Sequence, residues 1–263
     1  MKTIELPDIA WAAALVVING CISIALRLKL EKSLLLASVR TIVQLLLVGY
    51  VLQKIFENDH WYAVLAMVVF MTIVAGTSAV GRTSRRYPGI YIDSLLAIWC
   101  SSWIVSIYGL LIVFRSEGAW YQPQYAIPLT GMILGNSLNG ISLGLNQLGE
   151  QLATRRGEVE SMLALGATRW EAAQPCVSRA VQTGMTPVIN SMMVVGLVNL
   201  PGMMTGQLLA GATPSQAVRY QIIIMFMIAA ATAMGTVGVV LLSFRRHFNA
   251  DHQMGRSQPP VGT

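Results

Sequence analysis

Charged residues are scarce in this chain. Asp, Glu, Lys and Arg together make up 11% of its 263 residues, whereas 54% of the residues are hydrophobic. An average soluble domain is about a quarter charged, so this composition excludes an ordinary soluble protein. The hydrophobic residues gather into runs close to the roughly 20 residues that a helix needs to cross the hydrocarbon core of a bilayer. The sequence therefore predicts a multi-pass membrane protein.

Side chains that carry chemistry are few as well. The three cysteines and three histidines lack the clustered spacing of a disulfide framework or a zinc site. Because catalysis needs several such groups close together, a membrane enzyme is disfavoured. The chain also lacks a G-x-x-x-x-G-K-[ST] phosphate loop. We therefore expect a protein that is not an enzyme and binds no cofactor itself.

Seven apolar stretches are long enough, or nearly so, to cross the membrane. They lie at 8–26, 34–52, 61–80, 92–114, 126–148, 185–206 and 219–243. Lipid cannot satisfy free backbone amides and the chain lacks the short alternating segments of a barrel, so the predicted fold class is an all-α bundle. We predict one transmembrane domain, residues 1–246. A polar, Pro-containing tail, residues 247–263, is expected to be disordered and cytoplasmic.

The basic residues predict how the bundle is oriented. Thirteen Lys and Arg residues lie on one side of a seven-span topology and four on the other, with Arg40 inside the second span. The larger set is Arg27, Lys29, Lys32, Arg82, Arg85, Arg86, Arg155, Arg156, Arg169, Arg179, Arg245, Arg246 and Arg256. Because basic residues stay in the cytoplasm, we expect the N-terminus outside and the C-terminus inside. The net charge of +6 then needs no nucleic-acid partner.

A polar, basic segment, residues 149–184, separates the fifth and sixth spans. Within it, Met162 and Leu165 suit a short amphipathic helix that Gly166 ends as a C-terminal glycine. Thr168 has the pattern of an N-cap, because the glutamate three residues later completes a capping box. The sequence therefore predicts two short helices here, lying parallel to the membrane on its cytoplasmic side.

These two helices are candidates for a docking site. A hinge at Gly166 and Ala167 would let them present Met162, Leu165 and Trp170 to a groove on a partner protein. The alternative is an interfacial helix that only seals the cytoplasmic face of the bundle.

The same segment matches a known motif. From Glu160 to Gly166 the spacing resembles the EAA motif of ABC-transporter permeases, with the acid and the glycine in place and two alanines replaced by Ser161 and Met162. Glu158 supplies a second acid just before the motif. In that family the motif forms the coupling helix, which binds a separate ATPase. The resemblance therefore implies this role for Glu158, Glu160, Met162, Leu165, Gly166, Ala167, Thr168 and Trp170.

Three further stretches make the resemblance specific. They read SVRTIVQLLLVGYVL at 38–52, GMILGNSLNG at 131–140 and NLPGMMTGQLLAGATPSQAVRYQIIIMF at 199–226. With them the chain resembles, over almost its whole length, the FetB-type family of iron-export ABC permeases, whose plant relatives are linked to aluminium tolerance. The resemblance implies a permease homodimer in the bacterial inner membrane. It implies export of iron or a related metal, driven by a cytosolic ATPase subunit that binds ATP and Mg.

Polar side chains in the fifth span predict part of a transport path. Gly131, Gly135, Asn139, Ser142 and Asn146 recur at steps of three and four residues and share one helical face. The glycines are typical of close helix packing. Asn136 lies beside this face, and with Asn139 it offers amide groups to a cargo. The alternative is that both amides form interhelical hydrogen bonds.

Arg40 is the basic residue that lies well inside a span. Gln44 follows one turn later on the same face. An arginine at this depth faces protein or water, so we assign both residues to the path. Asp93 is the one plausible acidic partner, and snorkelling of Arg40 to the cytoplasmic interface is the alternative.

The sixth span contains a helix breaker. Asn199, Pro201 and Gly202 interrupt it, and broken helices often form transporter sites. We assign them to the path together with the residues that follow them: Met203, Met204 and Gln207. Thioether sulfur prefers soft ions to iron, so the ligands of any metal stay unassigned and iron rests on the resemblance.

Two alternatives stay open. A secondary carrier needs ion-coupling carboxylates inside the membrane, and Asp93 is only interfacial. An ABC permease for another metal chelate or a small anionic solute fits the same residues, because Arg40 would repel a bare cation.

Overall fold

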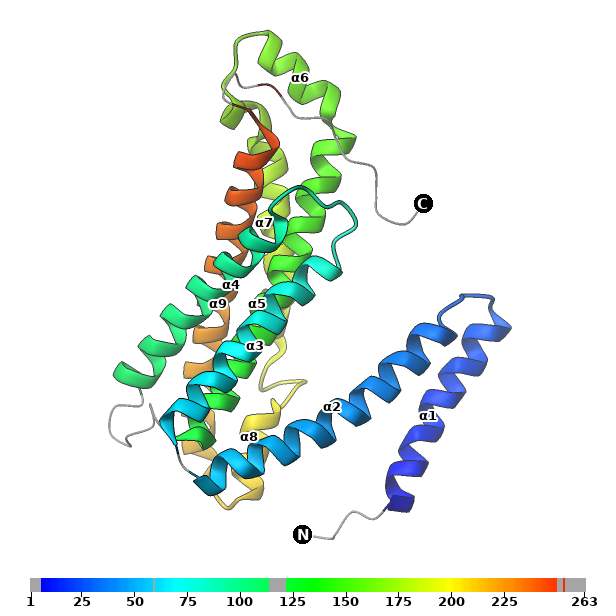
Figure 1. The fold of residues 1–263 in the computed structure, drawn as a ribbon, viewed down its shortest axis with the longest axis vertical. Helices are drawn as coiled ribbons and strands as arrows, with labels where there is room; N and C mark the ends of the chain where they lie inside the picture. The colour runs from blue at the N-terminus through cyan, green and yellow to red at the C-terminus, as the bar shows by residue number, and fades with distance from the viewer. Residues whose placement is uncertain (1–5, 59, 114–121, 250–252, 254–263) are drawn as a thin grey trace. The chain divides into compact units, whose positions relative to one another are not determined.

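The computed structural model describes residues 6–58, 60–113, 122–249 and 253, and within them it is helical with no β-strand (Figure 1). The predicted all-α class is confirmed. The chain divides into two compact units, residues 1–59 and 60–263. Most of the tail predicted to be disordered, residues 250–252 and 254–263, lies outside the described residues.

The first unit is a helical hairpin. Helix α1 (Leu6–Ala25) and helix α2 (Glu31–Asn58) are joined by a short turn in which Arg27 and Lys29 have positive φ angles. Ser23 closes this turn, because its hydroxyl accepts a hydrogen bond from the amide of Leu30 at 3.0 Å. Arg40 and Gln44 lie one turn apart on α2, and both are exposed.

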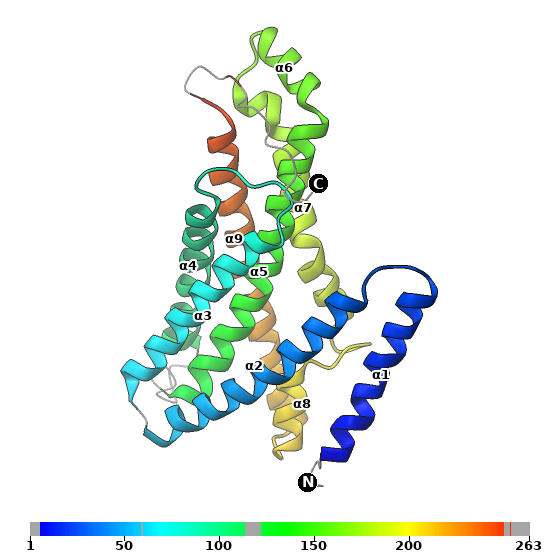
Figure 2. The same cartoon turned by 45° about the vertical axis from the view of Figure 1, so that its right-hand side comes forward.

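The second unit is a bundle of five long helices with two short ones. The long helices are α3 (Trp61–Gly81), α4 (Ile90–Tyr108), α5 (Pro123–Thr154), α7 (Arg169–Val194) and α9 (Pro214–His247). A π-helical segment, η1 (Gly109–Val113), continues α4. The short helices α6 (Arg156–Ala164) and α8 (Gly202–Leu209) lie at opposite ends of the bundle (Figures 1 and 2).

Helix α5 is the centre of this bundle and packs most extensively on α9 and α7. Glycines make the approach possible. A Cβ on Gly140 would lie 2.6 Å from Oγ1 of Thr236 on α9, and one on Gly184 of α7 would lie 2.7 Å from the carbonyl oxygen of Gly140. A Cβ on Gly135 would meet no atom within 4 Å. Close packing of α5 on α7 and α9 therefore occurs at Gly140, whereas Gly135 of the predicted face has open space beside it within this chain.

Four described helices are long and apolar enough to cross a membrane. They cover Glu31–Glu57, Trp61–Gly81, Ile90–Ile112 and Pro214–His247. These match the second, third, fourth and seventh predicted spans, and the predicted fifth span lies within the 32 residues of α5.

The prediction for the sixth span is wrong in its bounds. Helix α7 already begins at Arg169, runs unbroken to Val194, and is followed by a non-helical turn at 195–201. The second of the two short helices predicted in the cytoplasmic segment is thus the first part of α7. Helix α7 continues past its capped start although Pro175 and Pro187 lie inside it, and it ends just before Gly196, which has a φ of +83°.

Candidate functional site

The corner between α6 and α7 is built from two local motifs. The amide of Ala167 donates to the carbonyl of Met162 and that of Gly166 donates to the carbonyl of Leu163, both at 3.0 Å, while Gly166 has a φ of +93°. This is a Schellman motif, in which glycine accepts the left-handed conformation. The predicted helix stop at Gly166 is confirmed.

The start of α7 is the predicted capping box. The hydroxyl of Thr168 accepts from the amide of Glu171 at 3.3 Å, and the Glu171 carboxylate accepts from the amide of Thr168 at 2.8 Å. Hydrogen bonds that the carboxylate accepts favour its charged form. The pKa of Glu171 is therefore lowered, above all by the bond from the backbone amide of Thr168. The direction of the chain at this corner is therefore set by hydrogen bonds within a few residues.

The corner presents apolar side chains outward. Val159 is buried and anchors α6, whereas Leu165 is 89% exposed and Met162 is 41% exposed. Trp170 is also exposed, and its ring meets the ring of Phe244 on α9 edge-on with centroids 5.7 Å apart. We call Met162, Leu165 and Trp170 the corner patch. Exposed large hydrophobics that gather at one place often mark a protein interface.

The acids of the corner are paired with arginines three and four residues earlier in the chain. Glu158 forms a salt bridge with Arg155 at 2.6 Å, and Glu160 forms one with Arg156 at 2.7 Å. The hydrogen bond to Glu158 raises the pKa of Arg155. All four side chains are partly or largely exposed, so these pairs orient the helix and contribute little to its stability.

Two asparagines of α5 hold the loop between α3 and α4. The amide oxygen of Asn139 accepts from the Arg82 guanidinium at 2.9 Å. That of Asn146 accepts from the hydroxyl of Ser84 at 2.6 Å and from its backbone amide at 3.0 Å. Asn136 instead donates to a carbonyl of its own helix at 2.8 Å and is exposed. The two predicted path residues of α5 therefore differ, since Asn139 is engaged by a loop and Asn136 faces outward.

Asp93 has a different partner from the one predicted. Its carboxylate is 2% exposed and accepts from the guanidinium of Arg246 at 2.6 Å and from the Tyr87 hydroxyl at 3.0 Å. Arg246 lies at the end of α9, 153 residues along the chain. Within its own unit Asp93 is thus paired with Arg246, whereas the predicted partner, Arg40, belongs to the first unit. Burial raises the pKa of Tyr87, which keeps its hydroxyl protonated as the donor in this contact.

The predicted helix break is confirmed, but it covers residues 195–201 instead of beginning at Asn199. Gly196 has a φ of +83° and its amide donates to the carbonyl of Asn199 at 2.9 Å, closing a tight turn. The Asn199 side chain is exposed. Pro201 then precedes the first residue of α8, Gly202, as its N-cap.

Beside the break lies a cavity of about 530 Å³ between α7, α8 and α9. Met192, Met204 and Met225 line it together with Gln221, whose buried amide oxygen has no hydrogen-bond partner in the described part of the chain. Met203 lies half-buried on α8, and the amide oxygen of Gln207 is likewise buried without a partner. Such a lining suits apolar or soft groups better than a hard cation.

The predicted site residues thus fall into four groups. The coupling residues lie at the α6–α7 corner, Asn136 and Asn139 lie on α5, and a third group lies at the break between α7 and α8 or on α8: Asn199, Pro201, Gly202, Met203, Met204 and Gln207. Arg40 and Gln44 belong to the first unit. Among the described residues, no group of three His, Cys, Asp or Glu could hold a metal.

Sequence reasoning missed the loop contacts. From the sequence, Arg82 and Arg246 were used only to predict the orientation of the bundle, although each binds a polar side chain of another helix. The buried Asp93 could have indicated a basic partner, because an ionised carboxylate inside a protein needs one. Nothing local indicated which basic residue that would be.

Comparisons with known proteins identify relatives along most of the chain. A family described as "Uncharacterised protein family (UPF0014)" matches residues 6–248. A UPF0014 membrane protein of Synechocystis is 40% identical over 227 residues, which is 86% of this chain and 87% of the relative. The "Probable iron export permease protein FetB" of Escherichia coli is 34% identical, covering 94% and 93% of the two chains. The Arabidopsis thaliana protein ALUMINUM SENSITIVE 3 is 34% identical over 92% and 88%. No solved structure matches the chain.

Proposed function

This chain belongs to the UPF0014 family and is a multi-pass membrane protein, and on that basis we propose that it is the permease subunit of an ABC transporter. We propose further that it exports iron or a related metal from the cytoplasm, as a near orthologue of E. coli FetB. The name of that relative, a probable iron export permease, supports the cargo and the direction.

The corner patch is the observation that carries the ABC assignment. A capped helix–turn–helix at one end of the bundle presents Leu165, Met162 and Trp170, and the spacing from Glu160 to Gly166 is that of a coupling motif. Because the sequence has no phosphate loop, ATP hydrolysis is assigned to a cytosolic partner that binds ATP and Mg.

The proposed topology has seven crossings, with the N-terminus outside and the C-terminus inside. The sixth crossing is α7, whose 26 residues span about 39 Å at 1.5 Å per residue. This exceeds the roughly 30 Å of a hydrocarbon core, so α7 reaches from the cytoplasmic corner to the far side. Helix α8 then lies on the outer side, and the basic residues of the α6–α7 corner and of the α9 end stay inside.

Contacts beyond the corner offer a route from the ATPase to the path. Trp170 meets Phe244, two residues before Arg246, and Arg246 holds Asp93. Tyr87 contacts the same carboxylate from the α3–α4 loop, and Arg82 of that loop binds Asn139. We propose that motion of the corner shifts the end of α9 and, through this loop, the polar face of α5.

The proposed path includes Arg40, Gln44, Asn136, Asn139 and Asn199. Asn136 carries an amide in the middle of a proposed span and is exposed in the single chain. Such a side chain must meet protein or water, so we propose that a second copy of the permease covers it and encloses the path. Two copies would also present two corners to the two ATPase subunits. An alternative cargo, a metal chelate or small anion, is favoured by the guanidinium of Arg82 next to Asn139. A secondary carrier is disfavoured because the buried Asp93 is already neutralised by Arg246.

The test is the interaction with a stand-alone ABC ATPase from the same organism, for which the neighbouring genes are the first place to search. Leu165→Arg should abolish its co-purification and the ATP hydrolysis stimulated by metal in liposomes, because a charge replaces an apolar contact. The matched control for co-purification is Val198→Arg, which changes a valine of comparable exposure, 84% against 89%, at the other end of the bundle. Equal ATPase recovery with both variants would refute the docking role of the corner.

Cargo is tested in the same liposomes with ferrous iron, other divalent metals and ferric citrate. Iron should stimulate hydrolysis and leave the cytoplasmic side. If only ferric citrate stimulated hydrolysis, the cargo would be a metal chelate instead of the iron ion. The assignment as an ABC permease would stay in place.

A further inference from the structure

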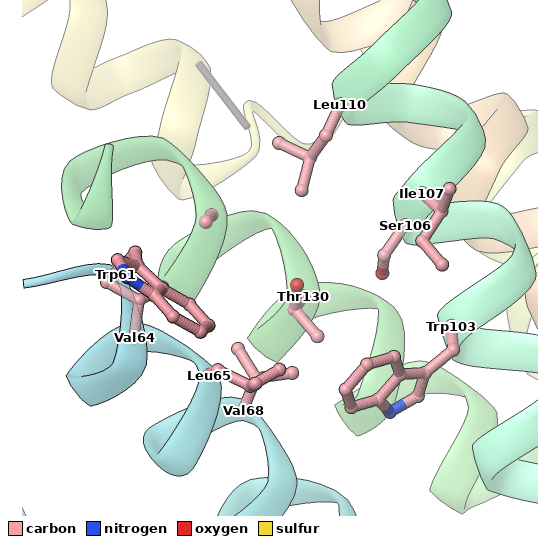
Figure 3. Close-up of a pocket in the computed structure, with 10 residues that line it drawn as sticks. Trp61, Val64, Leu65, Val68, Trp103, Ser106, Ile107, Leu110 and Thr130 are labelled. Atoms are coloured by element: carbon pink, nitrogen blue, oxygen red, sulfur yellow. The ribbon is translucent and has the colours of Figure 1, made fainter. Parts of the chain in front are cut away.

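A second cavity, of about 300 Å³, lies in the bundle away from the α6–α7 corner (Figure 3). It opens between α3, the end of α4 with η1, and the start of α5. Figure 3 shows Trp61 and Trp103 on opposite sides of it, with Val68 below and Leu110 above. Its volume is at the lower end of the range of small-molecule sites.

One polar group in this cavity lacks a partner. Ser106 is 6% exposed, and its buried hydroxyl has no hydrogen bond within the described part of the chain. In Figure 3 that oxygen points into the cavity. The indole nitrogen of Trp103, by contrast, donates to the hydroxyl of Thr72 at 3.2 Å. A buried hydroxyl without a partner costs free energy, so an acceptor inside the cavity would be favoured there.

A π-helical segment lies at one wall of this cavity. Helix α4 passes into the π-helical η1 at Gly109, where a Cβ would clash with the side chain of Met227 on α9. The wider turn places Leu110 over the cavity. Single-turn π segments of this kind are frequent at functional sites.

The mouth of the cavity opens between two helices that are long and apolar enough to cross a membrane. Both α3 and α4 are candidate spans, and Leu65 and Ile107 on the rim are exposed. Trp61, at the first residue of α3, is 65% exposed, as expected for an aromatic side chain at the membrane interface. Ser106 is seven residues from the end of η1, about 10 Å at 1.5 Å per residue. Ester groups lie at the edge of the hydrocarbon core, so a lipid ester carbonyl has to enter the pocket from its outer end to reach this hydroxyl.

We propose that this pocket binds a membrane phospholipid, with one acyl chain between Trp61 and Trp103 and an ester carbonyl accepting a hydrogen bond from Ser106. The proposal depends on the membrane location of the chain and is independent of the ABC function. A lipid matches the apolar walls and the single donor, and it is already concentrated at the pocket mouth.

Native mass spectrometry of the purified full-length protein tests the proposal. The protein is delipidated in detergent and titrated with palmitoyl-oleoyl phosphatidylglycerol. Wild type should retain one lipid per chain. Val68→Trp, which fills the pocket, should lose that lipid. Val69→Trp is the matched control, because Val69 is the next residue on α3 and does not line the pocket.

Ser106→Ala should bind the lipid roughly threefold to tenfold more weakly, as expected for one lost hydrogen bond. Gel filtration confirms that each variant is folded, and Leu65→Trp replaces Val68→Trp if the latter aggregates. Equal lipid retention by the Val68 and Val69 variants would overturn the proposal. So would disulfide crosslinking of Val68→Cys to another helix or copy, since protein would then occupy the pocket mouth.

Discussion

At the scale of single residues, the ion pair between Asp93 and Arg246 joins a buried charge to a partly exposed one. The Asp93 side chain is 3% exposed, whereas that of Arg246 is 43% exposed. Removing the arginine leaves a carboxylate without its charge partner in the interior. Removing the charge of the aspartate leaves a guanidinium that water can solvate. The two halves of one ion pair should therefore differ in what their loss costs.

We predict that Arg246→Ala destabilises the protein by about 2–4 kcal/mol and Asp93→Asn by about 1–2 kcal/mol, because an unpaired buried charge costs more than a lost bond. Thermal unfolding of both variants in the same detergent measures the order. The control is Arg245→Ala, a neighbouring exposed arginine, which should change the midpoint little. The reverse order of the first two variants would contradict the assignment of the buried partner.

The capping box predicts a pH dependence at the start of α7. Hydrogen bonds from Thr168 lower the pKa of Glu171 below its ordinary 4.5, so the folded state binds this proton less readily than the unfolded state. The stabilisation is therefore complete above the unfolded pKa and is lost as pH falls through the folded pKa. Hydrogen exchange at the first turn of α7, corrected for intrinsic rates, should speed up below about pH 4.5.

Glu171→Gln supplies the control for this effect. The glutamine keeps an acceptor for the Thr168 amide but cannot titrate, so the pH dependence of exchange at this turn should disappear. An unchanged acid response in Glu171→Gln would assign the effect to another group.

At the scale of elements, the contact of α5 with α7 and α9 depends on the absence of a side chain at one position. Gly140→Ala should destabilise the bundle by about 1–3 kcal/mol, because the methyl group meets Thr236 and overpacking is costly. Gly135→Ala on the same helix should be neutral or stabilising by roughly 0.5–1 kcal/mol, since the site is open and alanine favours helix. Thermal midpoints of the two variants measure the difference, and equal midpoints would show that the three helices can move apart without cost.

At the scale of the whole molecule, Asn136 and Asn139 distinguish a path from a packing face. Replacing either asparagine by leucine should leave expression unchanged, because leucine is compatible with a helix and is similar in size to asparagine. Cargo-stimulated ATP hydrolysis should fall at least about tenfold, the equivalent of about 1.4 kcal/mol. Asn136→Gln, which keeps the amide, should recover part of the activity. Normal export by both leucine variants would make these residues packing groups.

Much of the architecture followed from local patterns in the sequence. Apolar runs of bilayer length predicted the membrane helices, because a helix in lipid satisfies its own backbone wherever it lies. Gly166 and the capping box at Thr168 predicted the α6–α7 corner to the residue, since both motifs close hydrogen bonds within a few residues. The polar stripe of α5 was also visible, because helical periodicity places its residues on one face.

Only the tertiary structure decided what those faces meet. It paired Asp93 with Arg246 and Asn139 with Arg82, and it joined the predicted second coupling helix to α7. It also brought Trp61 and Trp103 to one cavity. The physical reason is separation along the chain. Caps and periodicity depend on neighbours within about two helical turns, whereas a buried carboxylate accepts whichever cation the packing of distant helices brings within hydrogen-bonding distance.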